Sequence, residues 1–176
     1  MKVILADVIS LNGKITKGDD PDIHSWSSAE DWEKFVQLRD SCDVIVIDRH
    51  TYETVLPKPE AGKLRIVLTT RATDFLDAIV PDQLEFRNTS VKLLIDELSL
   101  SGHKKVLVAG GGKVCADFMS AGLVDEFCLT LEPVLFGEGK AMLAERPFNV
   151  SLQLISVEKL NEQGTLLVRY KPIKSN

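Results

Sequence analysis

Short runs of consecutive apolar residues alternate with longer amphipathic segments over the first two thirds of the chain. An uninterrupted apolar run bounded by turn residues is typical of a strand that is covered on both faces. Such runs predict buried strands at Val3–Ile9, Val44–Ile47, Leu64–Leu68 and Lys105–Ala109. A shorter strand is expected at Leu84–Phe86.

The segments between these strands carry apolar residues at helical spacing. One helix is expected to begin after the N-cap Ser28 and to end near Cys42, and two others to cover Val91–Leu100 and Lys113–Ala121. A glycine closes each of the last two helices. Alternation of strands and helices predicts a parallel sheet with helices on its faces.

The last third of the chain has a different pattern. Three further strands are expected, at Glu126–Leu131, Leu152–Leu160 and Thr165–Lys171. The tight connection Asn161–Gly164 predicts that the last two form an antiparallel hairpin. The chain is therefore interpreted as a single α/β domain over residues 1–176, with a mixed sheet that is parallel early and antiparallel at its C-terminal strands.

Composition narrows the function classes. With 44% hydrophobic and 27% charged residues, the sequence is that of a soluble globular domain, which excludes intrinsic disorder. A net charge of −5 disfavours a nucleic-acid binder, and no apolar stretch approaches the length of a membrane span. The odd, widely spaced cysteines Cys42, Cys115 and Cys128 indicate reduced thiols, a cytoplasmic protein and no metal site.

The carboxyl ends of three predicted strands carry residues suited to anions. In open α/β sheets, ligands bind at this edge. Groups that suit phosphate follow the strands in the order Arg49, His50, Thr51; Thr69, Thr70, Arg71; and Gly110, Gly111, Gly112, Lys113. A glycine turn before a helix lets backbone N–H groups approach phosphate, and arginines add charge-assisted donors. Together they predict an elongated anion such as a dinucleotide, although each feature alone also fits a plain turn or an exposed strand end.

No side chain stands out as catalytic. His50 lies near a turn without a recognisable nucleophile, which is typical of a structural histidine. Asp31 is interpreted as a charge that complements the dipole of its helix. Trp26 and Trp32 are interpreted as packing residues because no basic stripe surrounds them.

Several segments resemble a known family in the same order along the chain. V-I-V-I-D-R-H-T-Y-E-T at 44–54 and V-L-V-A-G-G-G-K-V at 106–114 are similar to cofactor-binding segments of dihydrofolate reductases. The motifs S-L-N-G-K at 10–14, W-S-S at 26–28 and G-L-V-D-E-F-C-L-T-L-E-P-V-L-F-G-E-G at 122–139 resemble the reductase domain of riboflavin biosynthesis. The resemblance implies a three-layer α/β/α dihydrofolate-reductase-like fold and an NADPH-dependent reductase that acts on a pyrimidine- or pterin-like substrate.

The resemblance also implies roles for individual residues. Cofactor binding is expected at Ala6, Arg49, His50, Thr51, Thr69, Thr70, Arg71, Gly110, Gly111, Gly112, Lys113 and Val114. A mobile loop and the substrate side are expected at Asn12, Gly13, Lys14 and Thr130. A cis peptide is expected between Gly110 and Gly111, and a homodimer through the late strands.

Two residues depart from the family pattern. Asp48 stands where glycine is usual before the arginine, and would repel a phosphate unless it turns away or pairs with Arg49. Asn12 replaces the aspartate that is usual in the opening motif, so the resemblance does not determine the identity of the substrate. The alternatives are a dihydrofolate or pteridine reductase, disfavoured by the lack of a convincing buried carboxylate, and a nucleotide-binding module without turnover.

Overall fold

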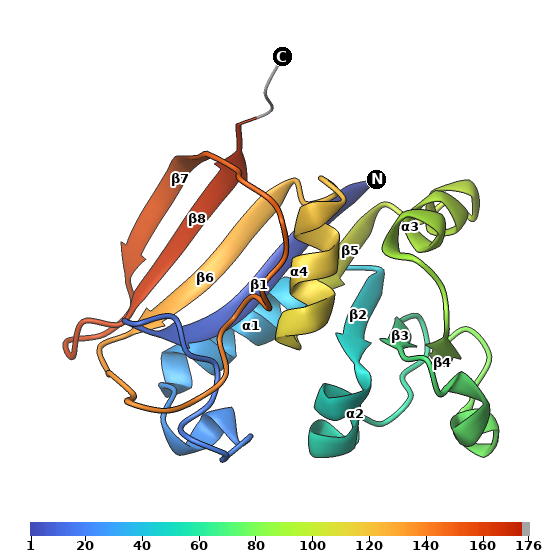
Figure 1. Ribbon diagram of the computed structural model, residues 1–176, viewed down its shortest axis with the longest axis horizontal. Helices are drawn as coiled ribbons and strands as arrows, with labels where there is room; N and C mark the ends of the chain where they lie inside the picture. Colours follow the sequence, from blue (N-terminus) through green and yellow to red (C-terminus); the bar gives the residue numbers. More distant parts are fainter. Residues whose placement is uncertain (174–176) are drawn as a thin grey trace.

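The computed structural model describes residues 1–173 and arranges them around one eight-stranded sheet (Figure 1). The strand order is β4-β3-β2-β5-β1-β6-β8-β7. The strands are β1 (Lys2–Ser10), β2 (Val44–Asp48), β3 (Leu64–Leu68), β4 (Leu84–Arg87), β5 (Lys105–Val108), β6 (Glu126–Glu132), β7 (Leu152–Lys159) and β8 (Leu166–Pro172). Neighbouring strands from β4 to β6 are parallel to each other, whereas β8 is antiparallel to both of its neighbours, β6 and β7. The mixed sheet predicted from the sequence is confirmed.

Helices cover both faces of this sheet. They are α1 (Ala29–Asp40), α2 (Arg49–Val55), α3 (Val91–Leu100) and α4 (Gly112–Ser120), with 3₁₀ turns η1 (Ile23–Ser25) and η2 (Ala72–Ala78). Side chains of α3 and α4 pack into one core, whereas those of α1 pack into another on the opposite face (Figure 1). Ser28 caps α1 as expected, since its hydroxyl accepts a hydrogen bond from the Asp31 N–H at 3.3 Å. The three-layer α/β/α fold is therefore confirmed.

Helix α2 is not among the helices predicted from the sequence. Its seven residues are mostly polar and none is buried, so it has no apolar stripe to detect. It begins because the Asp48 side chain accepts a hydrogen bond from the Thr51 N–H at 2.7 Å. It ends at Leu56, whose backbone has a positive φ of 42°.

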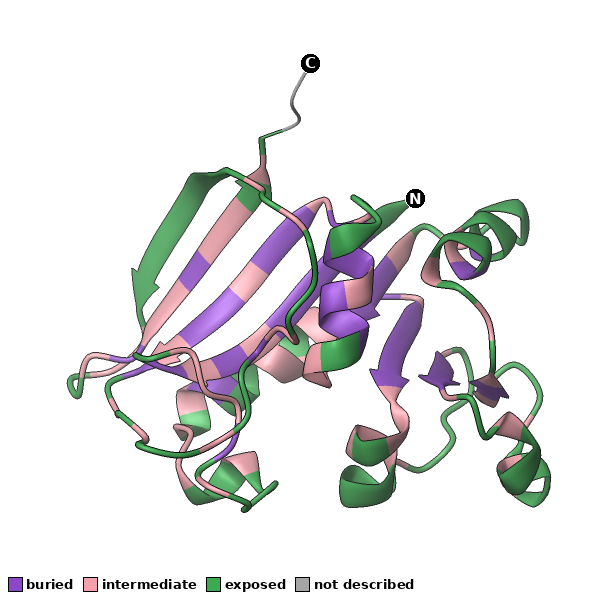
Figure 2. Cartoon of the chain, viewed as in Figure 1, coloured by how far each residue is buried: buried purple, intermediate pink, exposed green. Residues whose placement is uncertain are grey.

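Burial follows the position of each strand in the sheet (Figure 2). Every residue of β3 is buried, whereas every residue of the edge strand β7 is exposed. The exposed residues of β7 include Leu154, Ile155 and Val157. The homodimer expected through the late strands stays a prediction.

The two central strands separate at their carboxyl ends. Strand β1 pairs with β5 only as far as the Leu5–Val108 pair, but it pairs with β6 as far as Ser10 and Glu132. The chain leaves β5 through the glycines that precede α4. This separation leaves a gap at the edge of the sheet where ligands bind in open α/β folds.

The prediction of a cis peptide bond between Gly110 and Gly111 is wrong, because all peptide bonds of the described residues are trans. The turn instead uses a positive φ of 96° at Gly110, a conformation that glycine adopts readily. A cis bond outside proline costs about 2.5–4 kcal/mol, and the trans turn avoids this penalty.

A buried carboxylate fastens the start of α1 to the antiparallel end of the sheet. Glu132, at the end of β6, is 3% exposed. One of its oxygens accepts a hydrogen bond from the Ser28 N–H at 2.7 Å, and the other accepts one from the Thr165 hydroxyl at 2.7 Å. Since both oxygens have donors, the charge is compensated without a cation.

We predict that Thr165→Val lowers the free energy of unfolding by about 1–3 kcal/mol, because it leaves a buried carboxylate oxygen of Glu132 without its donor. Urea denaturation measures this change. Thr89→Val is the matched control, since the buried Thr89 hydroxyl has no hydrogen-bond partner in the structure. Equal destabilisation by both substitutions would contradict the role given to Thr165.

Candidate functional site

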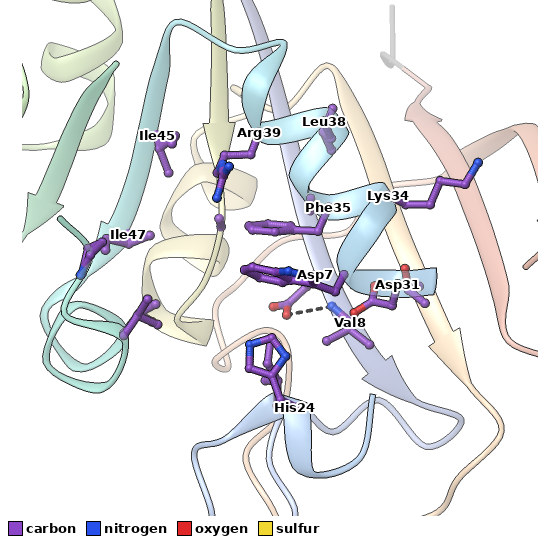
Figure 3. Close-up of a pocket in the computed structure, with 18 of the residues that line it drawn as sticks. Asp7, Val8, His24, Asp31, Lys34, Phe35, Leu38, Arg39, Ile45 and Ile47 are labelled. Carbon is purple, nitrogen blue, oxygen red and sulfur yellow. Dashed lines mark hydrogen bonds between the residues drawn. The ribbon is translucent and has the colours of Figure 1, made fainter. Parts of the chain in front are cut away.

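A cavity of about 770 Å³ lies on the α1 side of the sheet (Figure 3). Its walls come from β1, β2, α1 and α2, from Pro21–His24, and from the segment that follows α2. Figure 3 shows Asp7, Asp31 and His24 together toward one end, with Arg39 and Ile45 toward the other. Acidic side chains therefore lie toward one end of the cavity, and a basic side chain lies toward the other.

Asp31 projects from the first turn of α1 and lines this cavity. It lies in the first turn of α1, as the sequence predicted, but it is only 6% exposed. Burial raises the pKa of Asp31 to about 6, although a hydrogen bond with the Thr130 side chain acts in the opposite direction. A carboxyl group in this state can hold a proton near neutral pH.

Asp7 lies on β1 just beyond the point where β1 and β5 separate. Its Oδ1 accepts a hydrogen bond from the Val8 N–H at 3.0 Å, but its buried Oδ2 has no partner within the described part of the chain. Burial raises the pKa of Asp7 to about 7, and the charge of Asp31 adds to this shift. Two proton-binding carboxyl groups thus lie in one cavity, and they disfavour simultaneous ionisation.

The glycine turn after β5 packs tightly against the start of α2. The Gly111 N–H donates a hydrogen bond to Thr51 Oγ1 at 3.4 Å. A Cβ at Gly111 would collide with the Asp48 carboxylate, and one at Gly112 would lie 2.7 Å from the Ala141 carbonyl oxygen. Glycine is the residue that fits at positions 111 and 112 without such a collision, so the turn itself carries no side chains there.

Asp48 turns toward α2 and does not pair with Arg49. Its Oδ1 is the helix cap described above. Arg49 instead donates to both carboxylate oxygens of Glu53, at 2.7 and 2.6 Å, and lies 3.3 Å from the His50 ring nitrogen. The basic residues at this edge are therefore partly neutralised by residues of their own helix.

The residues after β3 form a second polar group on the same edge. The Thr69 hydroxyl accepts a hydrogen bond from the Arg71 N–H at 3.0 Å. The Arg71 guanidinium is largely exposed and pairs with Asp74 at 2.6 Å. A surface ion pair of this kind is weak enough for an anionic ligand to compete with it.

A family model of the RibD C-terminal domain matches residues 1–166. The chain belongs to this family. Two Bacillus subtilis proteins are similar over nearly their whole length. YwjB is 25% identical in sequence, and the match covers 92% of this chain and 93% of YwjB. YyaP is 22% identical, and the match covers 96% of this chain and 94% of YyaP.

Solved structures share the fold of this RibD C-terminal domain. A putative riboflavin biosynthesis protein from a Shewanella species has a TM-score of 0.82 and 24% identity, covering 99% of this chain and 100% of its own. A pyrimidine reductase-like protein from Corynebacterium diphtheriae has a TM-score of 0.79 and 18% identity over 99% and 92%. A third structure is the Thermotoga maritima diaminohydroxyphosphoribosylaminopyrimidine deaminase/5-amino-6-(5-phosphoribosylamino)uracil reductase. Its TM-score is 0.77 and its sequence identity is 19%, and the match covers 98% of this chain and 56% of that protein. The family consists of reductases, and its match to residues 1–166 supports an oxidoreductase activity for this domain.

Some residues expected in the site of this RibD C-terminal domain lie elsewhere. Asn12, Gly13 and Lys14 do not line the cavity; they attach their turn to residues 136–142. The Val114 side chain is in the core, so only its backbone faces the glycine turn. Ala6 and Thr130 do line the cavity, as does Thr51.

Other cavity residues of the domain were missed by sequence reasoning. The signal for Asp7 was available, because a carboxylate interrupts an otherwise apolar strand. Pro21–His24 carried no comparable signal, since their position over the cavity depends on the path of a long loop. In this loop the His24 ring packs edge-on against Trp32 at 4.8 Å.

Two further findings concern residues 1–173 of the domain. No helix in this part is long and apolar enough to cross a bilayer. Within the same residues, no cluster of three or more histidine, cysteine or acidic side chains is arranged to hold a metal ion.

We predict that the domain loses stability as the pH rises from about 4 to about 7. An acid whose pKa is raised on folding, as that of Asp7 is from 3.8 to about 7, keeps its proton in the folded state while the unfolded chain releases it. Asp7→Asn removes this difference and raises the free energy of unfolding at pH 8, by up to about 4 kcal/mol. Urea denaturation at pH 5 and pH 8 measures both changes.

The exposed Asp19 supplies the control for this prediction. Asp19→Asn should leave the pH dependence of unfolding as it is in the unmodified chain. If Asp7→Asn left that dependence equally unchanged, the carboxyl group of Asp7 would not be protonated in the folded protein.

Proposed function

We propose that the protein is an NADPH-dependent reductase that transfers hydride to a pyrimidine- or pterin-like heterocycle. One observation carries this proposal. The buried, proton-binding carboxyl groups of Asp7 and Asp31 line a large cavity where β1 separates from β5. A reduction that adds hydride and a proton to a double bond needs such a proton source in a site shielded from water.

The residues at the carboxyl edge of the sheet fit a phosphorylated dinucleotide. The glycine turn presents backbone N–H groups at the start of α4, and Gly111 and Gly112 leave no room for side chains there. Arg49 and Arg71 would hold phosphate groups once released from Glu53 and Asp74. The Asp48 carboxylate caps α2 and also lies against Gly111, so a phosphate at this turn would have to bind beside that negative charge.

NADPH, when bound, supplies the hydride, and the protein supplies orientation and the proton. The protonated Asp31 carboxyl would donate its proton to the nitrogen or oxygen of the reduced double bond. Thr130 would keep the carboxyl oriented through their hydrogen bond. Trp32 and Phe35, stacked at 5.7 Å, and the Pro21–His24 segment would exclude water from that step.

A ribosylaminopyrimidine substrate is supported by the activity named for the Thermotoga maritima protein. A pteridine is the second candidate, and one observation favours it. No buried carboxylate that could protonate a pteridine ring was evident from the sequence, but Asp31 is a buried carboxylate in the cavity, at 6% exposure. The objection to a dihydrofolate-type activity is thereby removed.

The cofactor is tested by fluorescence titration with NADPH and NADH. We expect Arg71→Ala to weaken NADPH binding by about tenfold, the loss of one charge-assisted contact with the additional phosphate, and to change NADH binding little. Lys92→Ala is the control, since Lys92 is an exposed residue of α3 that pairs with Asp96. Equal losses for both nucleotides would remove Arg71 from the phosphate site, and no binding of either would overturn the proposed cofactor.

The proton source is tested by following NADPH oxidation with ribosylaminopyrimidine phosphate and with dihydrofolate. Turnover should fall as the pH rises above about 6, because Asp31 then loses its proton. Asp31→Asn should lower turnover about 100-fold or more and leave NADPH binding unchanged. Asp96→Asn, at an exposed position of α3, should behave like the unmodified chain. Undiminished turnover by Asp31→Asn would show that the proton comes from elsewhere.

A further inference from the structure

His24 lies between the acidic end of the cavity and the solvent. It lines the cavity, and Figure 3 shows its ring at the same end as Asp7 and Asp31. The residue is nevertheless exposed, whereas Asp31 is only 6% exposed. One imidazole ring is therefore in contact both with the solvent and with the cavity that contains a nearly inaccessible carboxyl group.

The position of His24 is fixed by its loop and by α1. The Asp22 side chain accepts a hydrogen bond from the His24 N–H at 3.0 Å and thereby caps the short turn η1. The His24 ring packs edge-on against Trp32 of α1, with the ring centroids 4.8 Å apart. Among residues 1–173, the hydrogen bond of His24 to Asp22 uses the backbone, and neither ring nitrogen is occupied by a hydrogen bond. Both nitrogens can therefore exchange protons.

The charge of His24 acts on Asp31. Burial raises the pKa of Asp31 to about 6, and the negative charge of Glu132 on β6 raises it further. The hydrogen bond with the Thr130 side chain and the positive charge of His24 lower it. Histidine is the side chain that ordinarily binds and releases protons between pH 5 and 8, which includes the range in which Asp31 changes its charge. A proton can pass between two such groups with little free-energy difference.

The other charged groups at this end cannot take the same role. Asp7 of β1 has a buried oxygen and lacks the exposure of His24. Asp22 holds the backbone of η1, and Lys34 of α1 pairs with Glu158 at 2.8 Å. Nor do the other histidines line the cavity, since neither residue 50 nor residue 103 belongs to its walls. His24 therefore combines exposure, a titrating ring and a place in the cavity wall.

We propose that His24 supplies protons from the solvent to Asp31. After Asp31 has lost its proton, an N–H bond of the His24 imidazolium breaks and the proton moves to an Asp31 carboxylate oxygen, directly or through one water molecule. The neutral imidazole then takes up a proton from water or from a buffer acid, which restores both groups. His24 acts through Asp31 and does not contact the reacting atoms. The inference rests on the proposed function for the use of the Asp31 proton, but the exchange between the two side chains needs no substrate.

The first test measures how fast the Asp31 carboxyl group exchanges its proton in the absence of substrate. In the full chain labelled with carbon-13 at its aspartate carboxyl carbons, relaxation dispersion near pH 6 reports this rate, and Asp31→Asn identifies the signal. His24→Gln should slow the exchange about tenfold or more, because no titrating ring remains beside the buried carboxyl group. Imidazole added to the buffer should restore much of the lost rate, since it replaces the missing proton donor.

Two further variants separate proton transfer from a structural role. His24→Phe can keep an aromatic ring against Trp32 but carries no exchangeable proton, so it should exchange as slowly as His24→Gln. If His24 only supported Trp32, His24→Phe would exchange like the unmodified chain. His103→Gln is the matched control, because His103 lies between α3 and β5 and does not line the cavity. It should leave the exchange rate of Asp31 unchanged.

Turnover tests the same step during the reaction. At pH 5, where Asp31 starts with its proton, His24→Gln should leave the first oxidation of NADPH nearly unchanged and slow the later ones, whereas Asp31→Asn should slow all of them. The inference is overturned if His24→Gln exchanges the Asp31 proton as fast as the unmodified chain, if His24→Phe keeps the full rate, or if His24→Gln slows first and later turnovers alike. Slow exchange in His24→Gln without any NADPH oxidation by the unmodified chain would leave the proton link in place and reject the reductase.

Discussion

The separation of β1 from β5 is the constraint on which the site depends. Parallel pairing holds these strands together up to the Leu5–Val108 pair, and beyond it β1 continues with β6 in the described chain. The chain from β5 turns away through glycines that no other residue could replace at Gly111 and Gly112 without a collision. The gap brings Asp7 to the cavity, and it brings the glycine turn against the start of α2. One change of pairing therefore positions both the end of the cavity that holds Asp7 and the adjacent glycine turn.

Two buried polar groups in the cavity oppose the stability of the fold. Among residues 1–173, Asp7 has a buried oxygen without a donor, and the Arg65 guanidinium has no carboxylate partner. Each would be more favourable in water or beside a partner. Such sites are commonly maintained at the expense of folding stability.

Sequence periodicity was sufficient to predict the sheet and its long helices, because their apolar residues repeat at the spacing of the element that buries them. It was insufficient for α2, whose seven residues depend on the Asp48 cap and bury no side chain. The predicted phosphate-binding residues do gather at one edge, since the carboxyl ends of parallel strands must meet there. The burial of Asp31 could not be predicted, because the helix dipole explains an acid at that position equally well. The hydrogen bond between Asp31 and Thr130 of β6 arises from the packing of α1 on the sheet, which the sequence pattern of α1 alone does not contain.

Charged residues within the apolar strands of this fold divide into two kinds, according to whether the fold supplies them with charged or hydrogen-bonding partners. Glu126 is buried at the start of β6, and both Lys2 and Arg169 pair with it. Glu132 is buried at the other end of the same strand, with two donors of its own. Asp7 and Arg65 occupy comparable strand positions but lack such partners, and both line the cavity. The fold therefore compensates the buried charges of Glu126 and Glu132, whereas Asp7 and Arg65 have no ion-pair partner among residues 1–173.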